Sequence, residues 1–358
     1  MTSAHPPFDA RVYHKICRSL AIAGYEVTLI VPYAGGGTAE HGIRLCKVPP
    51  PRGRRERMTT TLFRIYRQAV IQNAEIYHFH DPELMPVGLL LRLHGKKVIY
   101  DVHEDHSSNM AKQWIPPALR SLASFTVRAC EAVAGRACDH IVAATPRIAA
   151  NFNAKRTSIV QNFPWTSEFI TGNDLPYAQR DPIVAYIGYL ADSRGLREMA
   201  EAIQLVNAKM PSQLLMAGRM VSGAQDQPFT GSDFVELLGE VDRTRIADLL
   251  SRSRIGLVVY RPTPNYYFGQ PTKLLEYMAA GLPVVASDFP FYRQVIESSG
   301  CGLLVDPLKP EEIAKALLWL LENESEAELM GQRGRNAILE RYNWEIESRR
   351  LVSIYDSL

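Results

Sequence analysis

Short apolar segments alternate with amphipathic segments along almost the whole chain. Residues 26–32 (EVTLIVP), 97–101 (KVIYD) and 183–187 (IVAYI) are clear apolar examples. The stretches between such segments carry apolar residues at helical spacing. A strand that is apolar throughout is buried on both faces, and helices in alternation supply that cover. The pattern therefore predicts an α/β fold with parallel sheets.

The length of 358 residues is enough for two domains. We expect a first domain over residues 1–164, a polar linker over 165–180, a second domain over 181–342 and a C-terminal helix over 343–358. A helix is predicted over 8–23. A doubly wound domain needs a strand before this helix, but only residues 2–4 precede the loop HPPFD that leads into it. The first strand therefore looks shortened, unless the start codon is misplaced.

Composition and charge exclude several classes of protein. The net charge of +2 gives no reason to expect nucleic-acid binding. The five cysteines are scattered without metal-ligand spacing, which indicates free thiols in a reducing cytosol. No GxGxxG motif opens either domain, which argues against a nicotinamide dehydrogenase. No signal peptide or apolar run of membrane-spanning length is found, so we expect a cytoplasmic protein.

The stretch 266–288 (YYFGQPTKLLEYMAAGLPVVASD) reads as loop, helix, turn and strand. The helix is predicted over 273–280, after a turn-rich segment over 265–272. Amides at its start, with the positive end of the helix dipole, form an anion site suited to a diphosphate. Lys273 adds charge there, and Glu276 can accept hydrogen bonds from a ribose. The alternative is an ordinary capped helix.

The segment PTKLLEYMAAGLPVVASD resembles the donor-site segment of the family 4 glycosyltransferases, which are retaining enzymes. The resemblance covers nearly the whole chain and is closest to members that build bacterial surface polysaccharides. It implies the GT-B fold, in which two Rossmann-like, doubly wound domains face a cleft and the last helix crosses back onto the first domain. It implies transfer from a UDP- or GDP-sugar to a glycan or lipid-linked glycan, with no cofactor.

On the donor side the resemblance implies that Glu276 binds the ribose and that nearby amides hold the diphosphate. The family's Gly-Arg and Lys-Gly pairs correspond to Gly188-Tyr189 and Arg194-Gly195. Only the second pair keeps a basic residue, Arg194. The alternative interpretation of Arg194 is a solvated charge in a loop. Phe268 replaces a glutamate that contacts the donor sugar. The expected donor-binding residues are Gly188, Arg194, Gly218, Arg219, Glu240, Val241, Gly269, Gln270, Pro271, Thr272, Lys273, Leu274, Leu275 and Glu276.

In the first domain, two strands lead directly into polar clusters, HFHDPEL after residue 77 and VHEDH after residue 101. Such strand ends line the ligand crevice of α/β domains. The resemblance makes His103 a cleft residue, although a satisfied core histidine is the alternative. Catalysis is expected to rest on His103, Arg194 and Lys273. The acceptor-side candidates, each of which could equally be loop surface or structural, are His5, Asp9, Arg11, His80 and Glu104. A metal site is conceivable at these two clusters, although four-ligand spacing is absent. No Asp-x-Asp motif lies near the donor site, so no essential metal is expected.

Other functions stay open. The shortened strand and the departures at Tyr189 and Phe268 favour a non-catalytic, nucleotide-sugar-binding subunit of a polysaccharide assembly complex. A sugar-nucleotide epimerase would share the fold. The basic loop over 49–57 (PPPRGRRER) is either a solvated charge run or a contact for anionic lipid. The second reading predicts peripheral binding to the inner face of the membrane through the first domain.

Overall fold

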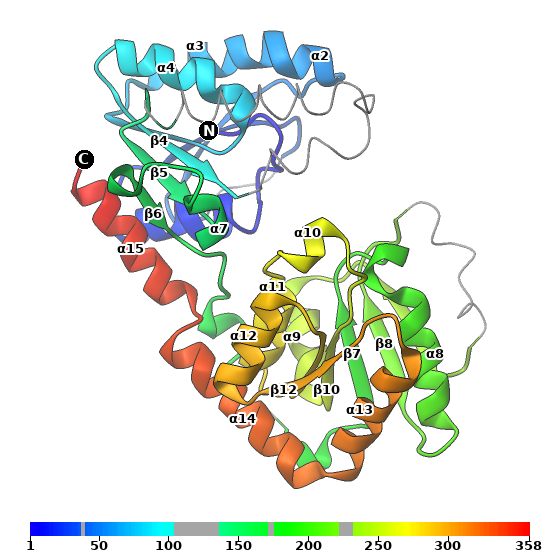
Figure 1. The fold of residues 1–358 in the computed structure, drawn as a ribbon. Coiled ribbons are helices and arrows are strands. Elements are labelled where there is room, and N and C mark those ends of the chain that lie inside the picture. The colour runs from blue at the N-terminus through cyan, green and yellow to red at the C-terminus, as the bar shows by residue number, and fades with distance from the viewer. Residues whose placement is uncertain (37–39, 104–134, 136, 171–174, 222–231) are drawn as a thin grey trace. The chain divides into compact units, whose positions relative to one another are not determined.

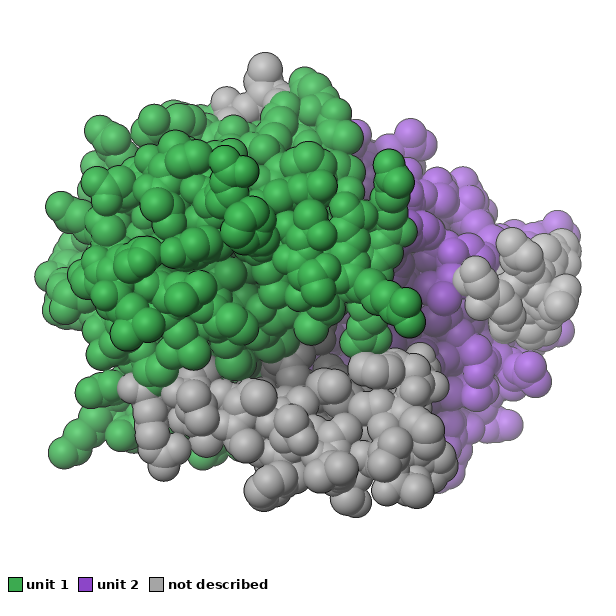
Figure 2. Space-filling model, turned by 90° about the horizontal axis from the view of Figure 1, so that it is seen from above, with its two compact units in different colours: residues 1–162, 345–358 green, residues 163–344 purple. Residues whose placement is uncertain are grey.

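The computed structural model describes residues 1–36, 40–103, 135, 137–170, 175–221 and 232–358 (Figure 1). The chain divides into two compact units, residues 1–162 with 345–358 and residues 163–344 (Figure 2). In the described part of the chain, no helix combines the length and the apolar composition that a bilayer crossing requires.

The first unit contains two groups of parallel strands. One is the pair β1 (Thr28–Pro32) and β2 (Arg44–Val48). The other has the order β3-β4-β5-β6, with bounds Ile76–Phe79, Lys97–Val102, His140–Ala143 and Thr157–Ile159. The parallel pairing predicted from the apolar segments is confirmed.

The first three residues join these two groups of strands. The Thr2 amide donates to the Ile30 carbonyl of β1 at 3.1 Å, and the His80 amide donates to the Met1 carbonyl at 3.3 Å. Met1, Thr2 and Ser3 are buried. This short segment therefore occupies the place between β1 and β3 where the sequence predicts a shortened strand.

The helix expected over residues 8–23 begins later than predicted. A π-helical stretch over Val12–Cys17 continues into α1 (Arg18–Ile22). The Asp9 carboxylate accepts hydrogen bonds from the amides of Arg11 and Val12, each at 2.8 Å. Because the Asp9 side chain caps these amides, the chain before Val12 stays in a turn.

The other described helices of this unit are α2 (Arg54–Glu56), α3 (Leu62–Gln72), α4 (Met85–Leu93), α7 (Pro146–Ala149) and α15 (Trp344–Asp356). The last of these packs on the first unit: the Tyr355 hydroxyl lies 2.8 Å from His78 Nδ1, and the Gln161 amide donates to Glu347 at 2.9 Å. Nearly all of a helix predicted over 117–137 falls outside the described residues, as does Glu104.

The second unit has one parallel sheet with the order β12-β11-β10-β7-β8-β9 and helices on both sides (Figure 1). In chain order, its strands β7 to β12 are Ile183–Ile187, Gln213–Ala217, Val235–Gly239, Ile255–Val258, Val284–Ser287 and Gly302–Val305. Its helices α8 to α14 are Leu196–Asn207, Arg243–Arg252, Pro264–Tyr267, Thr272–Ala279, Pro290–Ser299, Pro310–Glu322 and Glu324–Glu340.

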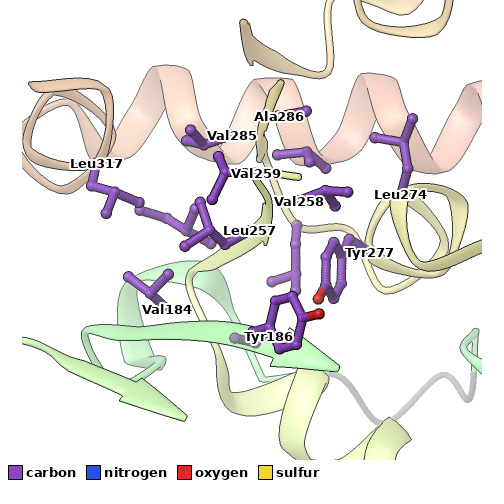
Figure 3. Packing of buried hydrophobic residues seen from close by; sticks show 14 of the residues in the cluster. Val184, Tyr186, Leu257, Val258, Val259, Leu274, Tyr277, Val285, Ala286 and Leu317 are labelled. Atoms are coloured by element: carbon purple, nitrogen blue, oxygen red, sulfur yellow. The ribbon is translucent and has the colours of Figure 1, made fainter. Parts of the chain in front are cut away.

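The core of this unit is built from the apolar strands and the inner face of α11 (Figure 3). Every residue of β7 is buried, and the Ile187 amide at its end donates to the Tyr277 hydroxyl of α11 at 2.9 Å. This bond fixes α11 against the end of β7. The prediction of a turn-rich segment before α11 was partly wrong, because Thr263 caps the short helix α10 there.

Candidate functional site

Three strands of the second unit end close together. Gly188 follows β7 and its amide donates to the Ala217 carbonyl at 2.8 Å, while the Gly218 amide donates to the Gly239 carbonyl at 2.7 Å. Gly188 and Gly218 have φ angles of +112° and +150°. A Cβ atom on Gly218 would lie 2.0 Å from the Gly188 carbonyl oxygen. The close approach of these two turns therefore requires glycine at position 218.

Lys273, in the first turn of α11, points into the unit beside Gly188. Its ammonium lies 3.6 Å from the centre of the Tyr186 ring, and it has no hydrogen-bond partner in the described part of the chain. A Cβ atom on Gly188 would lie 3.1 Å from this nitrogen and 3.3 Å from Arg194 Nη1. Burial, with a smaller contribution from Arg194, lowers the pKa of Lys273 well below its ordinary value.

Arg194 is held by aromatic side chains. Its Nε donates to the Tyr266 hydroxyl at 3.2 Å, and its guanidinium lies 5.3 Å from the Tyr260 ring centre and 5.4 Å from that of Tyr189. No carboxylate among the described residues forms an ion pair with Arg194 or Lys273. Two cations without a carboxylate partner therefore meet beside one glycine, which is an arrangement suited to an anion.

The start of α11 adds backbone donors to these cations. Pro271 occupies the N-cap, and no described side chain caps the helix. The amides of the first turn therefore have no partner within the helix. The expected donor residues Gly269, Gln270, Pro271 and Thr272 are partly exposed, and Leu274 and Leu275 are buried in the core.

Arg219 lies at the edge of the same site. Its guanidinium lies 5.3 Å from the ring centre of Tyr189, and the guanidinium of Arg194 contacts the same ring. Arg219 also forms a long, exposed ion pair with Glu240, with an N–O distance of 3.6 Å. Val241 follows in the turn before α9 and is partly exposed. The structure thus brings together the donor-side residues after β7, β8 and β9.

Glu276 is buried one turn into α11 and pairs with an arginine that our sequence analysis missed. Arg243 Nη1 donates to Glu276 Oε1 at 3.1 Å, and Arg243 Nη2 pairs with Glu168. The Arg243 guanidinium lies 5.3 Å from the Phe169 ring centre. Its position two residues after Val241, an expected donor-binding residue, was the one signal in the sequence that could have identified it.

In the first unit, His103 follows β4 and meets His5. The two Nε2 atoms are 3.0 Å apart, and His5 Nδ1 lies 3.1 Å from Asp81. Asp81 also accepts hydrogen bonds from the Thr2 hydroxyl at 2.7 Å and the Ser3 amide at 2.6 Å. Burial lowers the pKa of His103 to about 4, so at neutral pH its imidazole is uncharged.

Arg11 and His80, expected on the acceptor side, are both buried around Asp101 instead of facing solvent. Arg11 donates to both oxygens of Asp101, at 3.0 and 2.8 Å, and His80 Nδ1 lies 3.2 Å from one of them. A charged group that leaves water needs a partner of opposite charge, and Arg11 and Asp101 are each other's partner. Asp9 caps the following helix, as described above.

One group of side chains in the described residues has metal-ligand atoms close together, namely His78, His80 and Asp101, within 4.8 Å of one another. Both Asp101 oxygens already accept hydrogen bonds from Arg11. A fixed guanidinium at this place repels a second cation. The group therefore fits an internal ion-pair network better than a metal site.

Comparison with known proteins matches a glycosyltransferase family model to each of the two units. A family model described as Glycosyltransferase Family 4 matches residues 10–162, and one described as Glycosyl transferases group 1 matches residues 181–323. The phosphatidyl-myo-inositol mannosyltransferase of Mycobacterium tuberculosis is 30% identical over 190 residues, which are 51% of this chain and 49% of that protein. The MMP α-(1→4)-mannosyltransferase of Mycolicibacterium hassiacum is 22% identical over 182 residues, 49% of this chain and 43% of that protein. The chain thus spans less than half the length of these relatives.

Solved structures show the same fold. Sucrose-phosphate synthase from Thermosynechococcus elongatus matches with a TM-score of 0.67 and 20% identity, covering 96% of this chain and 91% of that one. Anabaena HepE in complex with UDP matches with a TM-score of 0.72 and 14% identity, covering 100% and 98%. The GT-B fold is thereby confirmed.

Proposed function

The chain belongs to the family 4 glycosyltransferases, and from this premise we propose that it is a retaining, metal-independent hexosyltransferase. It transfers a sugar from a UDP- or GDP-sugar to a glycan or lipid-linked glycan in surface polysaccharide synthesis. The observation that carries this proposal is the convergence of Lys273 and Arg194 beside Gly188, at the N-terminus of α11.

The chemistry consists of breaking the bond between the anomeric carbon and the diphosphate oxygen while the acceptor oxygen bonds to that carbon and passes its proton to the departing diphosphate. Negative charge builds on the leaving diphosphate. Lys273, Arg194 and the first amides of α11 stabilise it, and burial strengthens that effect because little water screens them. His103 contacts the acceptor or the donor sugar as a neutral hydrogen-bonding group. The acceptor is a glycan or a lipid-linked glycan; the name of the mycobacterial phosphatidyl-myo-inositol mannosyltransferase supports the second.

Calorimetric titration with UDP, GDP and ADP tests the donor site. We expect micromolar binding of one nucleotide and a loss of about tenfold or more in Glu276→Ala, because the ribose hydroxyls lose a buried acceptor. Arg252→Ala, in an exposed ion pair at the opposite end of α9, should bind as the wild type does. A folded protein that binds none of the three nucleotides would contradict the proposal.

A non-catalytic, nucleotide-sugar-binding subunit is the second candidate. It is favoured by Tyr189 and Phe268, which stand where the family has a cation and a carboxylate; both side chains are exposed at the site. Product analysis with the nucleotide sugar whose base binds separates the candidates. Sugar found on the acceptor supports the transferase, isomerised donor supports an epimerase, and binding without turnover supports the subunit.

We further propose that the transferase works at the inner face of the membrane, through a surface formed by α3 and α4. Phe63 and Ile71 on α3 are 59% and 64% exposed, and Leu93 on α4 is 82% exposed. The two helices contact each other, and the arginine-rich segment over residues 52–57 is joined to α3 by a short π-helical stretch, Arg57–Thr61. Apolar side chains beside a cluster of arginines fit the surface of an anionic bilayer.

Co-sedimentation with vesicles tests this surface. The protein should bind phosphatidylcholine vesicles that contain phosphatidylglycerol, and salt should weaken the binding. The double variant Arg54→Glu/Arg55→Glu should lose most of it, as should Phe63→Ser/Leu93→Ser. Leu329→Ser, on an exposed leucine of the second unit, is the matched control. Equal binding by all four proteins would refute the proposed surface.

A further inference from the structure

We propose that Arg243 is a positioning residue that fixes the carboxylate of Glu276 for the donor ribose and keeps that carboxylate away from Lys273. The inference rests on the proposed function, because it assumes that Glu276 binds a ribose. It concerns a residue that neither the sequence motifs nor the expected donor-binding set contains.

Arg243 holds one oxygen of Glu276 and leaves the other available. Its Nη1 donates to Oε1 at 3.1 Å, and no described residue donates a hydrogen bond to Oε2. A ribose diol needs an acceptor whose direction is fixed, and a carboxylate with one oxygen bound has that property. The geometry therefore gives Glu276 one oxygen for the arginine and one for the ligand.

Arg243 is itself held from three directions. Its second terminal nitrogen pairs with Glu168, and its planar face lies over Phe169, with 5.3 Å to the ring centre. Its backbone begins α9 directly after the N-cap Asp242, whose carboxylate accepts a hydrogen bond from the Arg245 amide at 2.8 Å. These contacts set the direction of the guanidinium, and through it the direction of the Glu276 carboxylate.

Lys273 and Glu276 lie three residues apart on α11, a spacing at which lysine and glutamate commonly pair. In the structure they form no ion pair, since Glu276 faces Arg243 and the Lys273 ammonium lies over Tyr186. Without Arg243, the buried carboxylate would have Lys273, whose charge it already influences, as an alternative cation on the same helix. Arg243 thus separates the two tasks, leaving Lys273 for the diphosphate and Glu276 for the ribose.

The test compares a nucleoside diphosphate with its 2′,3′-dideoxy analogue by calorimetry, using UDP or GDP according to which binds the wild type. In the wild type, removal of the hydroxyls should weaken binding by about tenfold or more. In Arg243→Ala this ratio should fall close to one, and binding of the ribonucleotide itself should weaken by about tenfold. Arg243→Lys should restore part of the ratio, because it returns the charge without the two-pronged geometry.

Two further variants separate positioning from general damage. Glu168→Gln should lower the ratio less than Arg243→Ala does, because it loosens the arginine without removing it. Arg245→Ala changes an arginine two residues along α9 that lines a different depression together with Asp181 and Asp248, and it should keep the wild-type ratio. A folded Arg243→Ala protein that retains the wild-type ratio overturns the inference while leaving the proposed function intact. A wild type that binds no nucleotide overturns both.

Discussion

The guanidinium of Arg11 and the carboxylate of Asp101 lie 90 residues apart in sequence and form a buried, two-pronged ion pair with N–O distances of 3.0 and 2.8 Å. Arg11→Met should destabilise the first unit by about 3–5 kcal/mol, because it leaves a buried carboxylate without its partner. The double variant Arg11→Met/Asp101→Leu should recover much of that loss. Urea unfolding measures both.

The control for this pair is Glu26→Ala, which removes an exposed ion pair with Arg44 at 3.6 Å in the same unit. Its free energy of unfolding should change by less than about 1 kcal/mol. Equal effects of Arg11→Met and Glu26→Ala would show that the buried pair contributes no more than a surface pair does.

The buried histidines of the first unit predict a loss of stability in mild acid. Burial holds the pKa of His78 well below its ordinary value and that of His103 at about 4, whereas an unfolded histidine titrates near about 6.5. Below that pH the unfolded chain binds more protons than the folded one, so the free energy of unfolding falls as pH falls. Each such histidine contributes at most about 1.4 kcal/mol per pH unit to this decrease in the free energy of unfolding.

Urea midpoints between about pH 7.5 and about pH 5 test this slope. His103→Asn should make the decrease shallower, since its contribution in the wild type continues until the pH reaches the pKa of about 4. A midpoint that stays constant over this range would exclude a role of buried neutral histidines in the pH dependence.

Lys273 predicts a conflict between stability and binding. Its buried ammonium has no hydrogen-bond partner among the described residues, and burial lowers its pKa. Lys273→Met should therefore raise the free energy of unfolding by about 1–2 kcal/mol. The same change should weaken nucleoside diphosphate binding by about tenfold or more. Lys315→Met, on an exposed lysine of α13, should change neither quantity, and a destabilised Lys273→Met protein would contradict the prediction.

Two glycines of the second unit should differ sharply in their tolerance of alanine. A Cβ atom on Gly218 would lie 2.0 Å from a backbone carbonyl oxygen, whereas the nearest atom to a Cβ on Gly300 is a flexible arginine side-chain carbon at 3.3 Å. Gly300→Ala should cost about 1–2 kcal/mol, for the left-handed backbone alone. Gly218→Ala should cost more than about 3 kcal/mol. Thermal unfolding of both variants measures the difference, and similar melting temperatures would argue against the tight packing of these turns.

The sequence predicts the architecture well because its signals are local. Strand β7 is buried along its whole length and consists of apolar residues and one tyrosine, so its bounds, Ile183–Ile187, follow directly from the sequence. Helix α10 was missed because it has only four residues, and a capped turn of that length looks like a loop. The start of the first helix was placed too early because the capping role of Asp9 is visible only in three dimensions.

The site was predicted less completely because its partners are distant in sequence. The motif around Lys273 and Glu276 predicts an anion site on α11, and the structure adds two tyrosines, Tyr186 and Tyr260, beside the lysine. No local pattern indicates that Arg11 pairs with Asp101, or that Arg243 pairs with Glu276 across 33 residues. From the sequence alone, each of these arginines could be a solvated surface charge. Only the folded chain shows that each one pairs with a buried carboxylate.

The first unit contains two separate stretches of the chain, residues 1–162 and residues 345–358. This arrangement determines the order in which the two units can complete their folding during synthesis. The ribosome must make the whole second unit before it reaches α15, whose Tyr355 contacts His78. At about 5–20 residues per second, the first unit waits roughly ten seconds or more for its last helix. During that time the surface that α15 later covers is open to chaperones, while the uninterrupted second unit can already complete its fold.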